Sequence, residues 1–337
     1  MGYSSQAGQV LLRSQAVQGT YQADTGTVGV GIKLRGGSLG TNRDLLVPDP
    51  EIGGGRDVVD AYLGAAVWSG DYEFYARMDS FATLLRAALG TAAAPVTVTG
   101  VTTHTITPSD AAQLPWLSIE EAIGNGLEAY QYTDCVVNTL HLEADANGYL
   151  MGTVGVIGAK QIGGITKTVA PVWDDTPMFV GTNITVTYNA VSLPAKSFSL
   201  DINNNIEDDD FRLGSFYVGD LTPKRREVTA SFGIRESSSA LWRQATYGTS
   251  AATQVGGLST KNELVITCQT YEDIPAGTPA TKYSLAITIP KFILTPYSLD
   301  ASGDDIIESD IEGQAVRPVA ATPLMTTVIK TGKATIA

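Results

Sequence analysis

Side chains that commonly carry out catalysis are scarce in this sequence, and their surroundings do not favour reactivity. The two histidines, His104 and His141, lie inside strand-like runs, where a solvent-facing or hydrogen-bonded histidine is far more common than an acid–base or metal-binding one. Cys135 and Cys268 lie in apolar stretches without a flanking basic residue or helix start, so we expect buried, inert thiols. The sequence predicts no enzyme activity, no catalytic residue, no metal site and no cofactor.

One segment begins like a calcium-binding loop but departs from that motif at two decisive positions. Asp201, Asn203 and Asn205 offer oxygen ligands at the expected spacing. However, Ile206 stands where the tight turn needs glycine, and Arg212 stands where a bidentate glutamate belongs. The chain also has no glycine-rich phosphate-binding motif. We therefore expect neither a calcium site nor a nucleotide site.

Composition narrows the class of protein further. The 337 residues include 22 basic and 35 acidic side chains, which give a net charge of −13. Nucleic-acid-binding proteins usually display a basic patch, so this balance argues against a surface that holds DNA but not against one that lets DNA pass. The hydrophobic content of 43% excludes wholesale disorder, and two cysteines exclude a disulfide scaffold. Without a secretory signal or a membrane-spanning run, we expect a protein made inside the cell that does not bind membranes.

The elements that would position any site are mainly β-strands. Apolar residues alternate with small or polar ones, with many β-branched residues, over segments 26–34, 96–107, 183–188, 197–202, 227–234, 263–268 and 283–289. Only two segments have a strong helical pattern, residues 79–89 and 237–247, and each is followed by glycine. Asp79 or Ser80 is the expected cap at the start of the first helix.

Ordered landmarks indicate an internal repeat. The glycines that end the two helices, Gly90 and Gly248, are 158 positions apart, and similar turn tetrapeptides occupy 145–148 and 300–303. Such a period is far too long for a solenoid repeat, so we interpret it as a doubled domain. The predicted units are residues 1–165 and 181–337, joined by a linker at 166–180. Each unit contains one long irregular segment, 35–56 or 203–225, and loops of this length in compact domains are usually functional or disordered.

Several short motifs together resemble the major tail tube proteins of long-tailed, non-contractile bacteriophages. The resemblance covers most of the chain, although each motif is weak alone and none is catalytic. The motifs are Ser69-Gly70-Asp71 running through 72–77 into the helix that ends Ala87-Ala88-Leu89-Gly90, then 132–140, Ala146-Asn147-Gly148, Gly158, 197–204 and Leu213-Gly214-Ser215.

The resemblance implies a β-sandwich or barrel tube domain with one flanking helix and a long stacking loop, present twice in this chain. It implies rings whose inner strands join around a channel, stacking of the rings into a hollow virion tail tube, and delivery of genomic DNA through it. Three copies would form a trimeric ring with pseudo-sixfold symmetry; six copies are the alternative if only one half is a tube domain. The implied partners are further copies, the tape measure, terminator and distal tail proteins, and DNA that passes without specific binding. Synthesis is expected in the host cytoplasm.

The resemblance also suggests where ring contacts and the channel lining lie. An acidic strand would repel phosphate and line the lumen; the candidates are Asp304, Asp305, Glu308, Asp310 and Glu312. Complementary charges on the long loops would attract one another across stacked rings; the candidates are Arg35, Arg56, Glu207, Asp208, Asp209, Asp210, Lys224, Arg225 and Arg226.

Two other classes of protein share parts of this profile. Another self-assembling shell or surface-layer protein would also be rich in β-structure and free of catalytic motifs. A carbohydrate-binding β-sandwich could use Trp68, Trp116, Trp173 or Trp242 as a sugar platform, although core packing is the commoner role for tryptophan.

Overall fold

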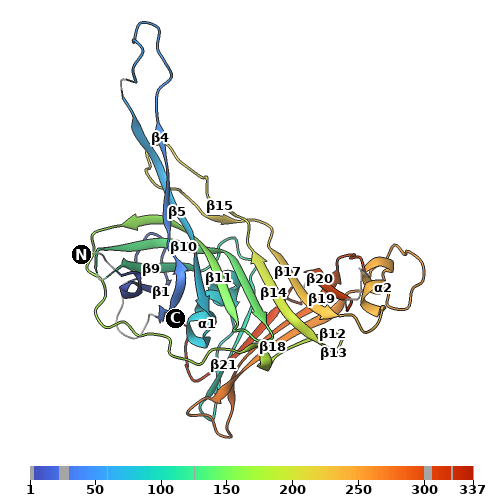
Figure 1. Cartoon of the computed structure of the whole chain (residues 1–337). Helices are drawn as coiled ribbons and strands as arrows, with labels where there is room; N and C mark the ends of the chain where they lie inside the picture. Colours follow the sequence, from blue (N-terminus) through green and yellow to red (C-terminus); the bar gives the residue numbers. More distant parts are fainter. Residues whose placement is uncertain are drawn as a thin grey trace.

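The computed structural model describes residues 4–22, 30–58, 60–124, 126–299, 306–319 and 322–336. The chain is mainly β, as predicted (Figure 1): nearly all its strands form one antiparallel hydrogen-bonded network that closes on itself, and one further pair of short strands forms a separate sheet. The two predicted helices are confirmed as α1 (Met78–Leu89) and α2 (Ala240–Tyr247), and two short 3-10 turns are η1 (Ser5–Ala7) and η2 (Gly181–Asn183). In the described part of the chain, neither helix has the length and apolar character needed to cross a membrane.

The first half of the chain forms a sheet with the spatial order β2-β1-β9-β10-β11-β5, and both β3 and β4 pair with the far side of β5. Segments β6 and β7 each pair with β8. The strands are β1 (Gln9–Gln15), β2 (Val30–Ile32), β3 (Leu34–Gly37), β4 (Gly40–Leu46), β5 (Tyr62–Tyr75), β6 (Gly90–Ala92), β7 (Val96–Val98), β8 (Val101–Pro108), β9 (Trp116–Ile123), β10 (Glu128–Asp145) and β11 (Met151–Ile162).

The second half repeats this spatial order as β13-β12-β18-β19-β20-β17-β14. In the first half, β5 leads into α1 and lies beside β3 and β4 at the edge of the sheet. In the second half, β17 leads into α2 and lies beside β14 in the same way. The strands are β12 (Ile184–Tyr188), β13 (Val191–Leu193), β14 (Ala195–Asn203), β15 (Ile206–Glu207), β16 (Thr222–Pro223), β17 (Glu227–Arg235), β18 (Asn262–Asp273), β19 (Lys282–Leu294), β20 (Glu308–Ala315) and β21 (Thr326–Thr331).

The two halves are joined edge to edge by backbone hydrogen bonds. The first part of β10 pairs with β9, and its last part leaves β9 and pairs with β14, from Thr139 opposite Asn203 to Asp145 opposite Ser197. A second connection runs from β19 through β21 to β8. One apolar core continues beneath both halves and includes Phe74, Leu140 and Phe232.

The segment between the halves, where a linker was predicted at 166–180, runs along the first half as a strap (residues 163–178). Thr168 donates hydrogen bonds from its backbone N and its Oγ1 to the buried carboxylate of Glu120, at 2.6 and 2.7 Å. Trp173 packs on Gly31 so closely that a Cβ at Gly31 would lie 2.8 Å from its ring. The strap therefore leaves no room for a side chain at position 31.

Helix α1 receives its capping groups from distant parts of the chain. The expected local cap is wrong: the N-cap residue is Arg77, which makes no side-chain cap bond, and Asp79 instead accepts a hydrogen bond from Thr331 Oγ1 at 2.9 Å. Asp174 of the strap accepts from the backbone N and Oγ of Ser80, at 2.6 and 2.7 Å. A carboxylate at this end complements the unpaired N–H groups and the helix dipole.

The opposite end of α1 is capped from the second half. Asn204 Nδ2 donates to the carbonyl of Ala88 at 3.0 Å, and Arg226 Nη2 donates to that of Leu89 at 3.4 Å. Arg226 Nε also holds Asn204 Oδ1 at 2.9 Å. Nearly all of α1 is buried, whereas α2 buries only Gln244 and Ala245, so α1 is a core element and α2 a peripheral one.

Replacing the capping arginine should weaken the fold. We expect Arg226→Ala to lower the free energy of unfolding by about 1–3 kcal/mol, because the carbonyl of Leu89 loses one of its two donors and the bonds of the guanidinium to Asn204 Oδ1 and the carbonyl of Ser109 are lost. Arg225→Ala is the matched control: this residue is exposed, and the change should stay within about 0.5 kcal/mol. Urea unfolding followed by circular dichroism measures both variants, and equal midpoints would contradict the capping role.

Candidate functional site

The predicted strand with one acidic side is confirmed in β20. Glu308, Asp310 and Glu312 are exposed, while Ser309 and Ile311 between them are buried against the core. Asp304 and Asp305, which were grouped with these residues, lie outside the described residues. The alternation follows from strand geometry, which points successive side chains to opposite sides of the sheet.

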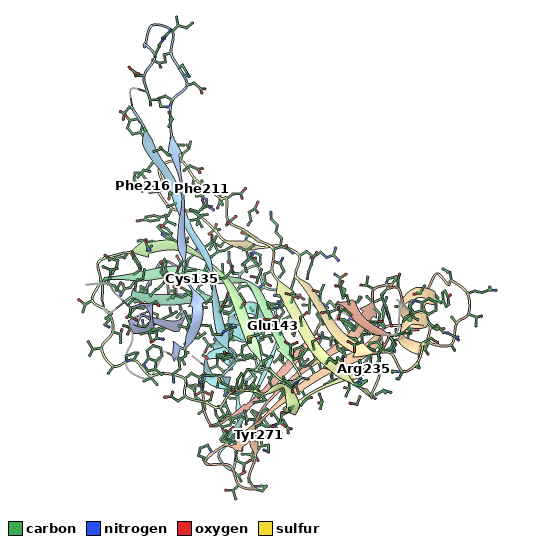
Figure 2. The ribbon with its side chains drawn as sticks, in the orientation of Figure 1. Cys135, Glu143, Phe211, Phe216, Arg235 and Tyr271 are labelled. Carbon is green, nitrogen blue, oxygen red and sulfur yellow. The ribbon has the colours of Figure 1, made fainter. Side chains whose placement is uncertain are left out.

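Neighbouring strands extend this surface across both halves. Cross-strand register places Glu312 opposite Ser231 of β17, Ser231 opposite Ser199 of β14, and Ser199 opposite Glu143 of β10. We call this surface the acidic face; it spans β5, β11, β10, β14, β17 and β20. Its carboxylates are those of Asp71, Glu73, Glu143, Asp145, Asp201, Glu227, Glu308, Asp310 and Glu312. Figure 2 shows Glu143 in the middle of this sheet and Arg235 toward its end.

Some of these carboxylates are paired with cations. His141 lies between Asp201, with Nδ1 2.6 Å from Oδ1, and Glu143, with Nε2 3.5 Å from Oε2. The hydrogen bond that His141 donates to the Asp201 carboxylate raises the pKa of His141 above its ordinary 6.5. Lys196 and Arg235 both bind Glu308 and lower the pKa of that carboxyl. Within the described ranges no ion pair reaches Asp310 or Glu312 on β20, so these two carboxylates are not neutralised by a neighbouring cation there.

The segment of 203–225, expected to carry ring contacts, folds onto the first half of its own chain. Ile206, Val218 and Leu221 pack with Val67 and Val136 of the first-half sheet in a second, smaller apolar cluster. Sequence reasoning missed this role, although apolar residues recur among the charges of the segment.

Several candidate loop charges are satisfied within that segment. Lys224 Nζ lies 3.3 Å from Glu207 Oε1, and Arg212 bridges Asp210 and Asp220 at 2.5 and 2.7 Å. Arg226 caps α1, as described above. For Asp208, Asp209 and Arg225, no ion pair is seen in the part of the chain that the structure describes.

The other long segment forms a projecting arm, defined here as β4, the start of β5 up to Ala66, and the intervening residues 47–61 (Figure 1). Arg56 lies near its exposed tip, whereas Arg35 lies on β3 with its guanidinium 5.2 Å from the ring centre of Tyr75. The arm is rich in exposed apolar side chains, which the charge-based prediction overlooked. These are Leu45, Leu46, Val47, Ile52, Val58, Tyr62 and Leu63.

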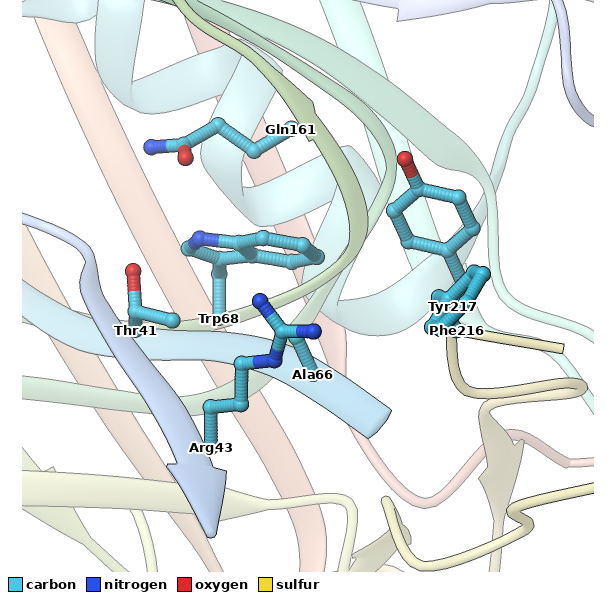
Figure 3. A pocket seen from close by; sticks show the side chains of 7 residues that line it. All are labelled: Thr41, Arg43, Ala66, Trp68, Gln161, Phe216 and Tyr217. Atoms are coloured by element: carbon cyan, nitrogen blue, oxygen red, sulfur yellow. The ribbon is translucent and has the colours of Figure 1, made fainter. Parts of the chain in front are cut away.

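A pocket of about 480 Å³ lies at the base of the arm, and we call it the arm-base pocket (Figure 3). It is lined by Thr41, Arg43, Ala66, Trp68, Gln161, Phe216 and Tyr217. Phe216 comes from the second half and lies beside the arm, as Figure 2 shows, and its carbonyl accepts a hydrogen bond from Ala66 N at 2.9 Å. Trp68 is only 6% exposed, so it offers no open aromatic platform for a sugar.

Groups suited to catalysis are not assembled in the described residues. The expected burial of Cys135 and Cys268 is confirmed, and burial raises the pKa of the Cys268 thiol to about 12. No group of three or more His, Cys, Asp or Glu side chains in the described ranges could hold a metal ion.

The pKa of His141 provides a direct test of the acidic face. We expect an NMR titration of the two histidine signals to give His141 a pKa above 6.5, and Asp201→Asn to lower it. Because the folded-state pKa is raised, this pairing stabilises the fold fully below the ordinary pKa and ceases to do so as pH rises through the raised value. The signal of His104, on β8 and bonded to the carbonyl of Lys333, serves as the internal reference. An unchanged His141 titration in Asp201→Asn would contradict the pairing.

Comparison with known proteins assigns the chain to a family. No curated protein matches the sequence. The model of the family described as phage tail tube protein matches residues 5–315, nearly the whole chain. That family is a structural one and not an enzyme class, and its members belong to the virion tail. The chain is therefore a member of the phage tail tube protein family.

Proposed function

We propose that this protein assembles into rings that stack into the hollow phage tail tube, and that genomic DNA is delivered to the host through the channel. The observation that carries the proposal is the edge-to-edge joint between β10 and β14. It connects two units with the same strand order, which we infer to be tandem tube domains at 1–165 and 181–337, joined by the linker at 166–180. One chain thus contains a joint of the kind that a ring repeats.

The ends of the chain's sheet supply the edges for the next joint. Among the described residues, β3 and β4 pair only with β5, so their outer edge is open. At the other end, residues 295–299 follow β19, and in the described part of the chain no strand pairs with their outer side. An open edge readily pairs with another chain, and a joint that closes by rotation produces a ring. Three copies would then supply six units, whereas six copies would be needed if only one half were a tube domain.

The acidic face is the proposed channel lining. Duplex DNA carries about one negative charge per 1.7 Å, and its binding to proteins depends on cationic contacts. Carboxylates such as Glu143, Asp310 and Glu312 would repel the phosphates, so DNA would slide without specific binding. We include Asp304 and Asp305 in the lining on the basis of sequence alone.

The arm is the proposed stacking element. Its exposed apolar side chains, with Ile52 fully exposed, favour burial against another copy in the next ring. Charges without an ion pair in the described residues, Asp208, Asp209 and Arg225, would add complementarity across that contact, together with Arg56 on the arm. At the two ends of the tube, tape measure, terminator and distal tail proteins are the proposed partners.

Shortening the arm should separate ring formation from stacking. We expect the purified full chain to form hollow tubes with three-fold rings in negative-stain electron microscopy. Replacing residues 47–61 with an Asn-Gly turn should leave rings but abolish tubes, because Leu46 and Tyr62 are already paired and can be joined by a two-residue hairpin turn. Six-fold rings would overturn the tandem-domain stoichiometry, and planar sheets would favour the surface-layer alternative. An unchanged thermal midpoint is the folding control for the shortened variant.

Reversing charge on the acidic face should make the channel retain DNA. We expect tubes of the variant Glu143→Lys/Asp310→Lys/Glu312→Lys to bind duplex DNA at low salt and to release it as salt rises, whereas wild-type tubes do not bind it. The control, Glu263→Lys/Glu272→Lys/Asp273→Lys, makes the same charge change on β18, outside the acidic face. Equal DNA retention by the two variants would show that net charge, and not the acidic face, controls binding.

A further inference from the structure

We propose that the arm-base pocket receives the C-terminal turn of α2 from the neighbouring copy in the same ring. This inference rests on the proposed ring and names a contact within it. Figure 1 shows α2 at the outer end of the second half, away from the arm of its own chain. A second copy is therefore the occupant that we assign to the pocket.

The contact has a precedent inside the chain. At the internal joint, Asn204 and Arg226 of the second half donate hydrogen bonds to the end of α1. Asn204 directly follows β14, and Arg226 directly precedes β17. Their donors reach the carbonyls of Ala88 and Leu89 in the last turn of α1. A unit of the sheet thus holds the helix of the unit before it.

The internal repeat transfers this contact to the arm-base pocket. The offset that superposes Gly90 on Gly248, two helix-ending glycines with φ of 104° and 93°, also relates Trp68 to Arg226. Strand pairing gives a second equivalence. The same offset relates Ser69 to Glu227, and their cross-strand partners are Gly40 and Asn203. The next residues along those partner strands, Thr41 and Asn204, therefore correspond to each other. Thr41 and Trp68 both line the pocket.

The same offset identifies the segment that would enter. Ala88 and Leu89 of α1 correspond to Thr246 and Tyr247 of α2. The carbonyl of Tyr247 accepts one hydrogen bond within the chain, from Gly256 N at 3.3 Å, just as the carbonyl of Leu89 accepts one from Ser109 N at 2.7 Å in addition to that from Arg226. The last turn of a helix also presents carbonyls that lack intrahelical partners. This turn therefore offers acceptors.

The pocket offers the complementary donors. Arg43 uses Nε to donate to the carbonyl of Gly64 at 2.7 Å, and no partner is seen for its terminal nitrogens in the described ranges. Arg43 and Gln161 flank the Trp68 ring (Figure 3), and the indole Nε1 also lacks a partner there. A guanidinium near a helix C-terminus is favoured by the helix dipole, as Arg226 is at α1. Arg43 would thus take the electrostatic role of Arg226.

Cross-linking between copies tests the contact. In the variant Thr41→Cys/Tyr247→Cys, a short bismaleimide should join neighbouring chains and give a ladder of linked chains on a denaturing gel. The matched control, Thr41→Cys/Tyr271→Cys, carries the second cysteine on exposed Tyr271 of β18, at the far end of the molecule in Figure 2, and should give no ladder. The native Cys135 and Cys268 are fully buried and should not react.

Electron microscopy of the same samples separates failure of the contact from failure of the ring. Rings with a ladder only in Thr41→Cys/Tyr247→Cys support the proposal. Rings without that ladder, or with an equal ladder in the control, overturn the contact and leave the ring proposal intact. Absence of rings from wild-type protein would overturn the ring proposal, and with it this contact.

Discussion

The backbone pairing of β10 with β14 is the interaction on which the rest of the structure depends. Because β10 is 18 residues long, it can pair first with β9 and then with β14 while β11 follows it on the other side. The sheets of the two halves thereby become one surface. A shift of this pairing by one residue would turn Leu200 outward and Asp201 inward, so the apolar core fixes the register. The acidic face crosses the joint unbroken for the same reason.

Helix α1 adds further contacts between the two halves at this joint. Its first turn is bound by Asp174 of the strap and its last turn by Asn204 and Arg226 of the second half. These groups satisfy helix-end N–H and C=O groups that would otherwise be costly to bury. The first half alone therefore does not supply all the hydrogen-bond partners of α1. The two units are therefore energetically coupled as well as adjacent.

Local pattern in the sequence was sufficient for the class of fold and for the alternation along β20. Period-two apolar residues predicted the strands, and the glycines at 90 and 248 marked the ends of both helices. Long-range partners carry no such local signal. Asp79 was a reasonable cap by position, but Asp174 lies 94 positions from Ser80 in the sequence and takes that role through folding. The charges at 207–226 suggested an intermolecular surface, yet Glu207, Arg212 and Arg226 find partners within the chain.

The two long segments occupy equivalent places in the two halves but are arranged differently. Much of segment 35–56 belongs to the projecting arm, whereas segment 203–225 lies over Val67 and Val136. In the ring that we propose, units with the same strand order would therefore not be interchangeable. In a three-copy ring, arms would stand at every second unit, so a following ring would fit in three rotational settings instead of six. Each ring would then dictate the azimuth of its successor. The orientation of the first ring assembled would therefore fix the rotation of every later ring and so the twist of the finished tube. The other three rotational settings would be excluded because the arms would not meet their matching surfaces.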